Sequence, residues 1–355
     1  MFIESPSDAA LITLRDELAS MAPSLEESGA WPAKQLRLCA EHGVYRWFVP
    51  QDLGGAGWSP AEIAKGYQLL SAGCLTTTFV VTQYTGACRR IAGCENALLK
   101  TMLLPQLLSG QIFATVGISH LTTSRRHLSK PVLLATEVDG GFLLDGMSPW
   151  VTGSVKADVV VVGATLEDGR QILASVPMGQ PSIATPAPPQ LVALGASKTG
   201  RVEFKSHFVP AQQLIGGPIE DVLKQGVGAG PGGLQTSTLA VGLAQAAVDF
   251  LRQESVARDD LADAAEALDS EVRQLSHDIE RLALGEEVCS NEQLRTRASS
   301  LALRSTQAAL AAAKGTGFVT GHPAGRWCRE ALFFLVWSCP QPVMAANLCE
   351  LAGIV

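Results

Sequence analysis

The sequence lacks the marks of a membrane, secreted or nucleic-acid-binding protein. Its longest apolar run, "ALFFLVW" at 331–337, is far shorter than the roughly 18 residues that a membrane-spanning helix needs. The N-terminus is acidic and amphipathic, which is not the pattern of a secretory signal. The formal net charge of -7 excludes an overall field that attracts nucleic acid or anionic membranes. We therefore expect a cytoplasmic protein with no membrane span and no nucleic-acid partner.

Metal-binding patterns are missing as well. The chain has 8 cysteines, but no two of them form a C-x-x-C pair. The most closely spaced two, Cys88 and Cys94, have no histidine nearby to complete a zinc site. We expect no metal site, and we expect most cysteines to be small buried side chains in a reducing compartment.

What the sequence does have is enough apolar material for a large core. It has 355 residues, of which 47% are hydrophobic and 17% charged, which is sufficient for two or three domains at roughly 150 residues each. Apolar residues recur at helical spacing through 8–49 and 59–109. Ser59 can cap the start of a helix, and Pro60 suits its first position.

The spacing of apolar residues changes in the middle of the chain and then becomes helical again. From 113 to 208, short apolar stretches alternate with turn signals, which predicts a small antiparallel β domain with "EVDGGFLLDG" as a hairpin. Residues 234–256, 262–284 and 291–314 are rich in alanine and leucine and again follow helical spacing. We therefore predict a helical domain at 1–110, a β domain at 111–210 and a helical bundle at 211–355.

Five motifs, in this order, resemble segments of the acyl-CoA dehydrogenase family, and they extend over nearly the whole chain. They are "GVYRWFVPQDLGGAGWSPAE", "LLPQLLSGQ", "LLDGMSPWVTGSVKADVVVV", "VGLAQAAVDF" and "GTGFVTGHPAGRWCRE". The resemblance implies an α+β fold with an N-terminal helical domain, a middle antiparallel β-barrel and a C-terminal four-helix bundle. It also implies FAD as cofactor, an acyl thioester or other small-molecule substrate, and a homodimer or homotetramer.

The resemblance carries a flavin-binding role to three residues. Trp150 and Thr152 match the family's "WIT" motif, in which the two side chains pack against the flavin ring and bond near its N5. An indole offers a flat surface for stacking, and a hydroxyl can donate or accept a hydrogen bond. Ser119 falls where the family has a threonine at the pyrimidine edge. The alternative is that Trp150 only packs within the β domain.

The expected contacts to the cofactor's phosphates are altered. The family's glycine-containing loop is replaced by "SHLTTSRRH", so we consider Arg125 a substitute donor, against the alternative of a solvated basic loop. Arg258 matches an arginine that the neighbouring subunit contributes in the family. In "RDDLA", however, the adjacent acids repel phosphate. Gly315 is what remains of a glycine pair. FAD binding and apo protein therefore both stay open.

The catalytic base of the family is missing from its usual position. The resemblance places Ser338 where most members have the glutamate that removes the α-proton of the thioester. Some members carry that glutamate on the first bundle helix, where this chain has Gly232. A serine without a base beside it does not remove such a proton at neutral pH. The alternative is that the loop is shifted relative to the family, so that Glu330 or Glu350 takes the position of the base.

These residues leave three hypotheses of function. The first is an FAD-dependent oxidoreductase with altered chemistry, such as a flavin-dependent monooxygenase. The second is a conventional dehydrogenase whose base is Glu330 or Glu350. Near Ser338, His120 and His322 are further side chains that could approach the pocket. The third is a non-catalytic subunit or binding protein that completes the site of an intact homologue in a heteromer.

Overall fold

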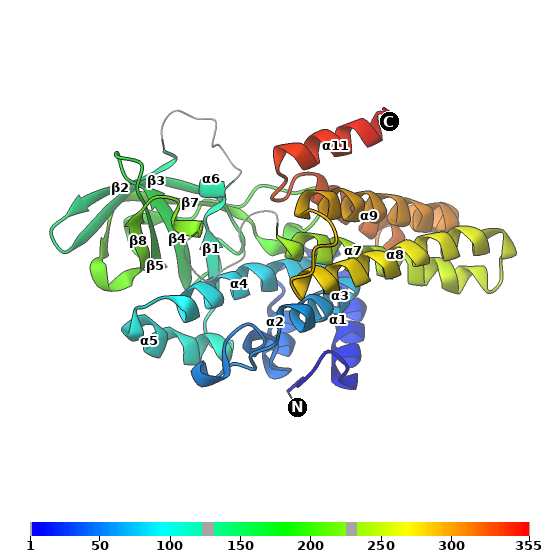
Figure 1. Cartoon of the computed structure of the whole chain (residues 1–355), viewed down its shortest axis with the longest axis horizontal. Helices are drawn as coiled ribbons and strands as arrows, with labels where there is room; N and C mark the ends of the chain where they lie inside the picture. Colours follow the sequence, from blue (N-terminus) through cyan, green and yellow to red (C-terminus); the bar gives the residue numbers. More distant parts are fainter. Residues whose placement is uncertain (1, 123–130, 225–232, 355) are drawn as a thin grey trace.

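The computed structural model describes residues 2–122, 131–224 and 233–354. Figure 1 shows the β-sheet at one end of the molecule, the C-terminal helices at the other end and the N-terminal helices beneath both. The predicted order of helices, strands and helices is confirmed, and with it the α+β fold class. No described helix combines the length and the apolar character that crossing a bilayer requires.

The N-terminal part is helical and begins as its capping residues predict. Ser59 accepts a hydrogen bond from the Glu62 amide at 3.3 Å, and the Glu62 side chain accepts from the Ser59 amide at 2.7 Å. Pro60 occupies the first helical position, so the predicted start is confirmed. The helices of this part are α1 (Ala9–Ser28), α2 (Ala33–Glu41), α3 (Pro60–Gly73), α4 (Leu75–Gly93) and α5 (Ala97–Leu108).

The helical spacing through 59–109 predicts no break after residue 73, and the structure has two there. Helix α3 ends at Gly73, and α4 starts at Leu75. Helix α4 ends at Gly93, and α5 starts at Ala97. Between them, the Asn96 side chain accepts a hydrogen bond from the Leu99 amide at 3.2 Å and caps α5. The side-chain amide of Asn96 also donates to the carbonyl of Gln212 at 2.8 Å, which joins this corner to the β domain. A cap residue therefore outweighs the apolar pattern on either side of it.

The middle part is an eight-stranded sheet with the order β6-β7-β3-β2-β4-β5-β8, and β1 pairs with β4. The predicted hairpin is confirmed as the antiparallel pair of β2 and β3. The sheet is mixed rather than purely antiparallel, because β4 lies parallel to β1 and β2. The strands are β1 (Ala114–Gly117), β2 (Leu133–Val138), β3 (Gly141–Val151), β4 (Val159–Thr165), β5 (Gln171–Pro177), β6 (Ile183–Ala184), β7 (Gly200–Pro210) and β8 (Leu214–Ile219).

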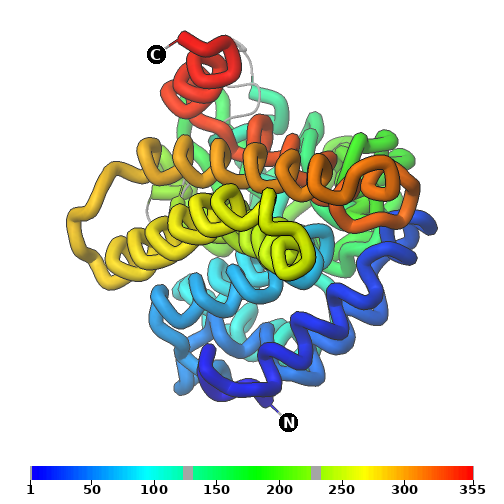
Figure 2. The backbone as a smooth tube through the Cα atoms, turned by 90° about the vertical axis from the view of Figure 1, so that its right-hand side faces the viewer, coloured from blue at the N-terminus to red at the C-terminus, as the bar shows by residue number. Residues whose placement is uncertain are grey.

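The C-terminal helices pack directly against the N-terminal ones. Gly242 of α7 lies so close to α3 that an added Cβ would come within 2.4 Å of the Gln68 carbonyl oxygen. Beside it, the Ser71 hydroxyl donates to the Leu239 carbonyl at 2.7 Å. Figure 2 shows the long helices of the two parts lying against each other. The C-terminal helices are α7 (Leu234–Ser255), α8 (Ala262–Ala283), α9 (Asn291–Ala313), α10 (Pro323–Ala331) and α11 (Gln341–Leu351).

The buried apolar residues form two cores. One extends through the N-terminal helices, the C-terminal helices and the adjoining strands, and the other lies within the sheet. Of the eight cysteines, all free, only the four in the N-terminal part are buried, and Cys349 is exposed. The expectation that most cysteines are buried is therefore half right.

Candidate active site

A cavity of about 650 Å³ lies where the three parts of the chain meet. Its walls come from α4, β1, the end of β3, residues 191–194, the start of α7, and residues 329–338 at the end of α10 and beyond. This volume is within the range of small-molecule and cofactor sites.

The wall contributed by the β domain contains the three residues that the sequence assigns to the flavin. Trp150 lies near the end of β3 and Thr152 directly follows the strand, and both line the cavity. The indole of Trp150 is 50% exposed. Thr152 is buried and accepts a hydrogen bond from Thr199 at 3.2 Å. Ser119 also lines the cavity, and its buried hydroxyl has no partner among the described residues.

A second wall is aromatic and leads to Ser338. The rings of Phe333 and Trp337 stack at 5.1 Å between centroids, and Phe79 of α4 meets Trp337 edge-on at 5.1 Å. Ser338 follows directly, lines the cavity and has a left-handed backbone with φ of 46°. The structure therefore brings Ser338 to the same cavity as Ser119, Trp150 and Thr152.

The loop that carries Ser338 is held from beneath by a buried arginine. Arg295 of α9 donates to the carbonyl oxygens of Phe334 and Trp337, both at 2.9 Å. Burial lowers the pKa of Arg295 to about 10, and its guanidinium stays charged at neutral pH. Charge-assisted bonds of this kind are stronger than neutral ones, so the backbone before Ser338 is fixed in place.

No aspartate or glutamate lines this cavity among the described residues. The segments 123–130 and 225–232, which include Gly232, lie outside the described residues, and neither contains an acidic residue in the sequence. Gly233, next to the family's second base position, lines the cavity but offers no side chain.

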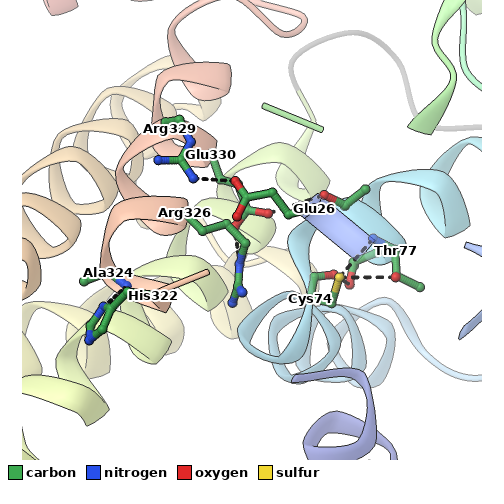
Figure 3. A network of polar contacts seen from close by, with 10 residues as sticks. Glu26, Cys74, Thr77, His322, Ala324, Arg326, Arg329 and Glu330 are labelled. Atoms are coloured by element: carbon green, nitrogen blue, oxygen red, sulfur yellow. Dashed lines mark hydrogen bonds and ion pairs between the residues drawn. The ribbon is translucent and has the colours of Figure 1, made fainter. Parts of the chain in front are cut away.

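The two alternative acids lie elsewhere. Glu330 is buried, is not among the residues that line the cavity, and lies in a polar network that Figure 3 shows. Its carboxylate accepts from the Thr76 hydroxyl at 3.3 Å and lies 3.8 Å from Arg326. Burial raises the pKa of Glu330 to about 7, and Arg326 partly opposes that rise. Glu350 is exposed on α11 and bonds Ser300.

The two candidate histidines have local structural partners. His120 is buried, and its Nε2 lies 2.8 Å from the Gly163 carbonyl oxygen. Burial lowers the pKa of His120 below its usual value. His322 accepts from the Ala324 amide at 3.2 Å and caps α10 (Figure 3). Neither histidine is among the residues lining the cavity.

Of the residues assigned to the cofactor's phosphates, the two that the structure describes, Arg258 and Gly315, do not line this cavity. Arg125 lies outside the described residues. Arg258 donates to the Ala312 carbonyl at 2.7 Å and has Asp260 at 3.7 Å. Gly315 is exposed just beyond α9. Arg258 and Gly315 are thus near the same end of α9, away from the residues that line the cavity.

Sequence reasoning missed two cavity residues, Arg89 and Arg90. They are consecutive on α4, a helix whose other described residues are otherwise uncharged. The adjacent arginines in "ACRRIAG" were the available signal, because a charged pair within a buried helix is unusual.

Comparison with known proteins shows which family the chain is similar to. Residues 7–111 match the family described as "Acyl-CoA dehydrogenase, N-terminal domain". The chain is 25% identical to the mitochondrial short-chain specific acyl-CoA dehydrogenase of Rattus norvegicus over 341 residues, which is 89% of this chain and 81% of the relative. It is 24% identical to a probable acyl-CoA dehydrogenase of Bacillus subtilis over 243 residues, covering 66% of this chain and 63% of that one.

Solved structures of the same fold align with nearly the whole chain. A glutaryl-coenzyme A dehydrogenase in complex with glutaryl-CoA aligns with a TM-score of 0.81 and 18% identity, covering 98% of this chain and 96% of the other. A prolyl acyl carrier protein oxidase aligns with a TM-score of 0.75 and 15% identity, covering 98% and 99%. The chain has the acyl-CoA dehydrogenase fold, and its similarity in sequence to acyl-CoA dehydrogenases confirms the resemblance that its motifs predicted.

Proposed function

We propose that the chain is an FAD-dependent oxidoreductase that acts on an acyl-CoA or a related acyl thioester without a glutamate base. The observation that carries this proposal is the cavity itself. It combines the side chains expected to face a flavin with a loop that ends in Ser338 and with no acidic lining residue among those described. The relatives named as acyl-CoA dehydrogenases support the cofactor and the substrate class.

The described residues fit the ring end of FAD. The half-exposed indole of Trp150 offers a flat apolar surface to a tricyclic ring. A buried hydroxyl without a partner is uncommon in a folded protein, and Ser119 has one beside this surface. Ser119, Trp150 and Thr152 would therefore hold the ring, while Arg125 and Arg258 stay proposals for the phosphates. A bound flavin supplies electron transfer that protein side chains cannot perform.

The residues around Ser338 favour chemistry other than conventional desaturation. Phe333 and Trp337 cover this part of the cavity with apolar surface, which excludes water from a bound thioester. Removing the α-proton of a thioester needs a carboxylate within hydrogen-bond reach, and Ser338 can only orient a substrate oxygen by hydrogen bonding. We propose a redox reaction that does not start with proton removal by an acidic side chain, such as a flavin-dependent monooxygenation.

The cofactor proposal is tested by titration with FAD. We expect the purified protein with added FAD to show flavin absorption near ~450 nm, and Trp150→Ala to weaken FAD binding about tenfold, since aromatic stacking contributes roughly 0.5–1.5 kcal/mol beyond area burial. Val192→Ala is the matched control, because Val192 lines the same cavity but is 75% exposed. Protein that stays colourless with excess FAD would contradict the proposal.

A non-catalytic subunit is the second candidate, and Arg258 favours it. The guanidinium of Arg258 is already bonded within its own chain and has Asp260 beside it, which opposes a phosphate there. In this case the chain completes the site of an intact homologue in a heteromer. Redox activity of the purified single chain would rule this candidate out.

We further propose that the chain is cytoplasmic and forms a homodimer or homotetramer. Large apolar side chains are exposed near the end of α9 and on α11, with Phe318 86% and Leu348 58% exposed. Apolar surface of this kind favours association between subunits. Sedimentation velocity measures the assembly directly, and a monomer at micromolar concentration would contradict it.

A further inference from the structure

A second cavity, of about 850 Å³, adjoins the first. Four residues line both cavities: Tyr67, Arg89, Gly233 and Gln235. The remaining walls of the second cavity come from α3, the start of α7, the end of α8 and residues 285–291. The two cavities therefore adjoin at these residues, and Arg89 lies in the wall that they share.

Arg89 lies at the end of the first cavity that is remote from Ser338. Phe79, Thr82, Gly86 and Arg89 follow one another at three- and four-residue intervals on α4, so they share one face of the helix. Phe79 meets Trp337, the neighbour of Ser338. With a rise of 1.5 Å per residue, the backbone of Arg89 lies about 15 Å along the helix from that of Phe79.

The charge of Arg89 has no acidic partner in the described structure. Arg89 is partly buried and makes no ion pair within 4.0 Å among the described residues. Glu286 and Glu287 both line the second cavity; Glu286 is paired with Arg281 at 2.6 Å, and Glu287 is exposed. The next residue, Arg90, is buried, and its pKa is lowered to about 10 by burial first and by the charge of Arg89 second. Arg90 donates to the Gly86 carbonyl at 2.9 Å, so the anion is assigned to Arg89. A partly buried guanidinium without an ion pair favours an anion at this point.

The helix face between Phe79 and Arg89 leaves room for a substrate chain. Gly86 lies one turn before Arg89 and lines the first cavity without a side chain. A Cβ at this position would meet Val116 and the Arg90 guanidinium at 3.6 Å, which is ordinary contact. Close packing therefore does not require glycine at position 86, and a larger side chain there would narrow the path to Arg89.

We propose that Arg89 binds a carboxylate at the far end of the substrate's acyl chain, which makes the preferred substrate the monothioester of a dicarboxylic acid. This inference rests on the proposed function, because it takes the thioester to lie against Trp337 and Ser338. A guanidinium can donate two parallel hydrogen bonds to a carboxylate, and this fork geometry fixes the orientation of the chain. Arg89 thus determines specificity and takes no part in the redox step.

Calorimetric binding with length-matched pairs of thioesters tests this assignment and requires neither bound flavin nor turnover. The pairs are glutaryl-CoA with pentanoyl-CoA, adipoyl-CoA with hexanoyl-CoA, and suberoyl-CoA with octanoyl-CoA. In the wild-type protein we expect the dicarboxylic member of at least one pair to bind about 10- to 100-fold more tightly, as a charge-assisted bond contributes. Arg89→Met should abolish that preference and leave the affinity for the neutral member unchanged.

Matched variants separate this role from other effects of charge. Arg37→Met removes an exposed arginine of α2 that lines neither cavity and should keep the preference. Gly86→Leu should reduce binding of the dicarboxylic member most, since it blocks the path to Arg89. If Arg89→Met weakens both members of a pair equally, Arg89 binds a phosphate of coenzyme A and the inference is overturned. Equal binding of both members by the wild type overturns the inference alone, whereas no binding of any thioester overturns the proposed function with it.

Discussion

Replacing Ser338 by glutamate is expected to give the chain an acyl-CoA desaturating activity that the wild type lacks. The loop already presents residue 338 to the cavity, and its backbone is held by Arg295. A positioned general base contributes about 10²- to 10⁴-fold to the rate of proton transfer, so the gain should be at least about 100-fold. The measurement is formation of the α,β-unsaturated thioester by FAD-loaded protein with an artificial electron acceptor.

The backbone at this position does not oppose the change. Ser338 already has a φ of 46°, a left-handed conformation that costs serine and glutamate alike. Ser338→Gln is the matched control, because its side chain has the size of glutamate but cannot take the proton. Desaturation by Ser338→Gln at the same rate, or by the wild type, would mean that the base lies elsewhere and that the proposed chemistry is wrong.

The second large effect is expected in the pH dependence of stability, and Glu330 causes it. Its pKa of about 7 in the folded chain lies above the ordinary value of 4.5. A carboxyl group whose pKa is raised by folding stabilises the fold fully below pH 4.5, and this contribution is lost as the pH rises to about 7. The difference of pKa corresponds to a loss on the order of 3 kcal/mol in the free energy of unfolding.

The contacts around Glu330 assign this loss of stability to the titration of Glu330 itself. Arg326 faces it at 3.8 Å, and Arg329 on the same helix is occupied by Glu26 at 2.6 Å (Figure 3). In Glu330→Gln the side chain no longer titrates, so the loss between pH 4.5 and 7.5 should shrink by that amount. Urea denaturation of both proteins at the two pH values measures it, with the exposed Glu287→Gln as control. Parallel pH curves for the wild type and Glu330→Gln would contradict the assignment.

Local rules of sequence predicted the element order and most boundaries of the fold. The start of α3 was predictable from Ser59, Pro60 and Glu62, because capping depends on residues only three positions apart. The parallel pairing of β4 could not be predicted in this way, since it depends on strands distant in the sequence. The break before Asn96 was missed because the apolar pattern continues across it. The domain ranges 1–110, 111–210 and 211–355 stay a prediction.

The candidate site was predictable where a motif carries it and not where the fold alone assembles it. The resemblance brought Ser119, Trp150, Thr152 and Ser338 to attention, and the structure places all four at one cavity. Whether they serve a flavin stays a prediction. The arginine pair of "ACRRIAG" was a signal for Arg89, but its place between two cavities could not be predicted, because the fold alone brings them together.

The anchoring of the loop by Arg295 has an evolutionary consequence. The two bonds that hold the loop go to main-chain carbonyls and not to any side chain at position 338. Natural selection could therefore exchange the residue there without rebuilding the scaffold beneath it. In such an architecture the catalytic base is a replaceable part, and a lineage can lose it, or regain it, by substitution of a single residue while the fold is inherited unchanged.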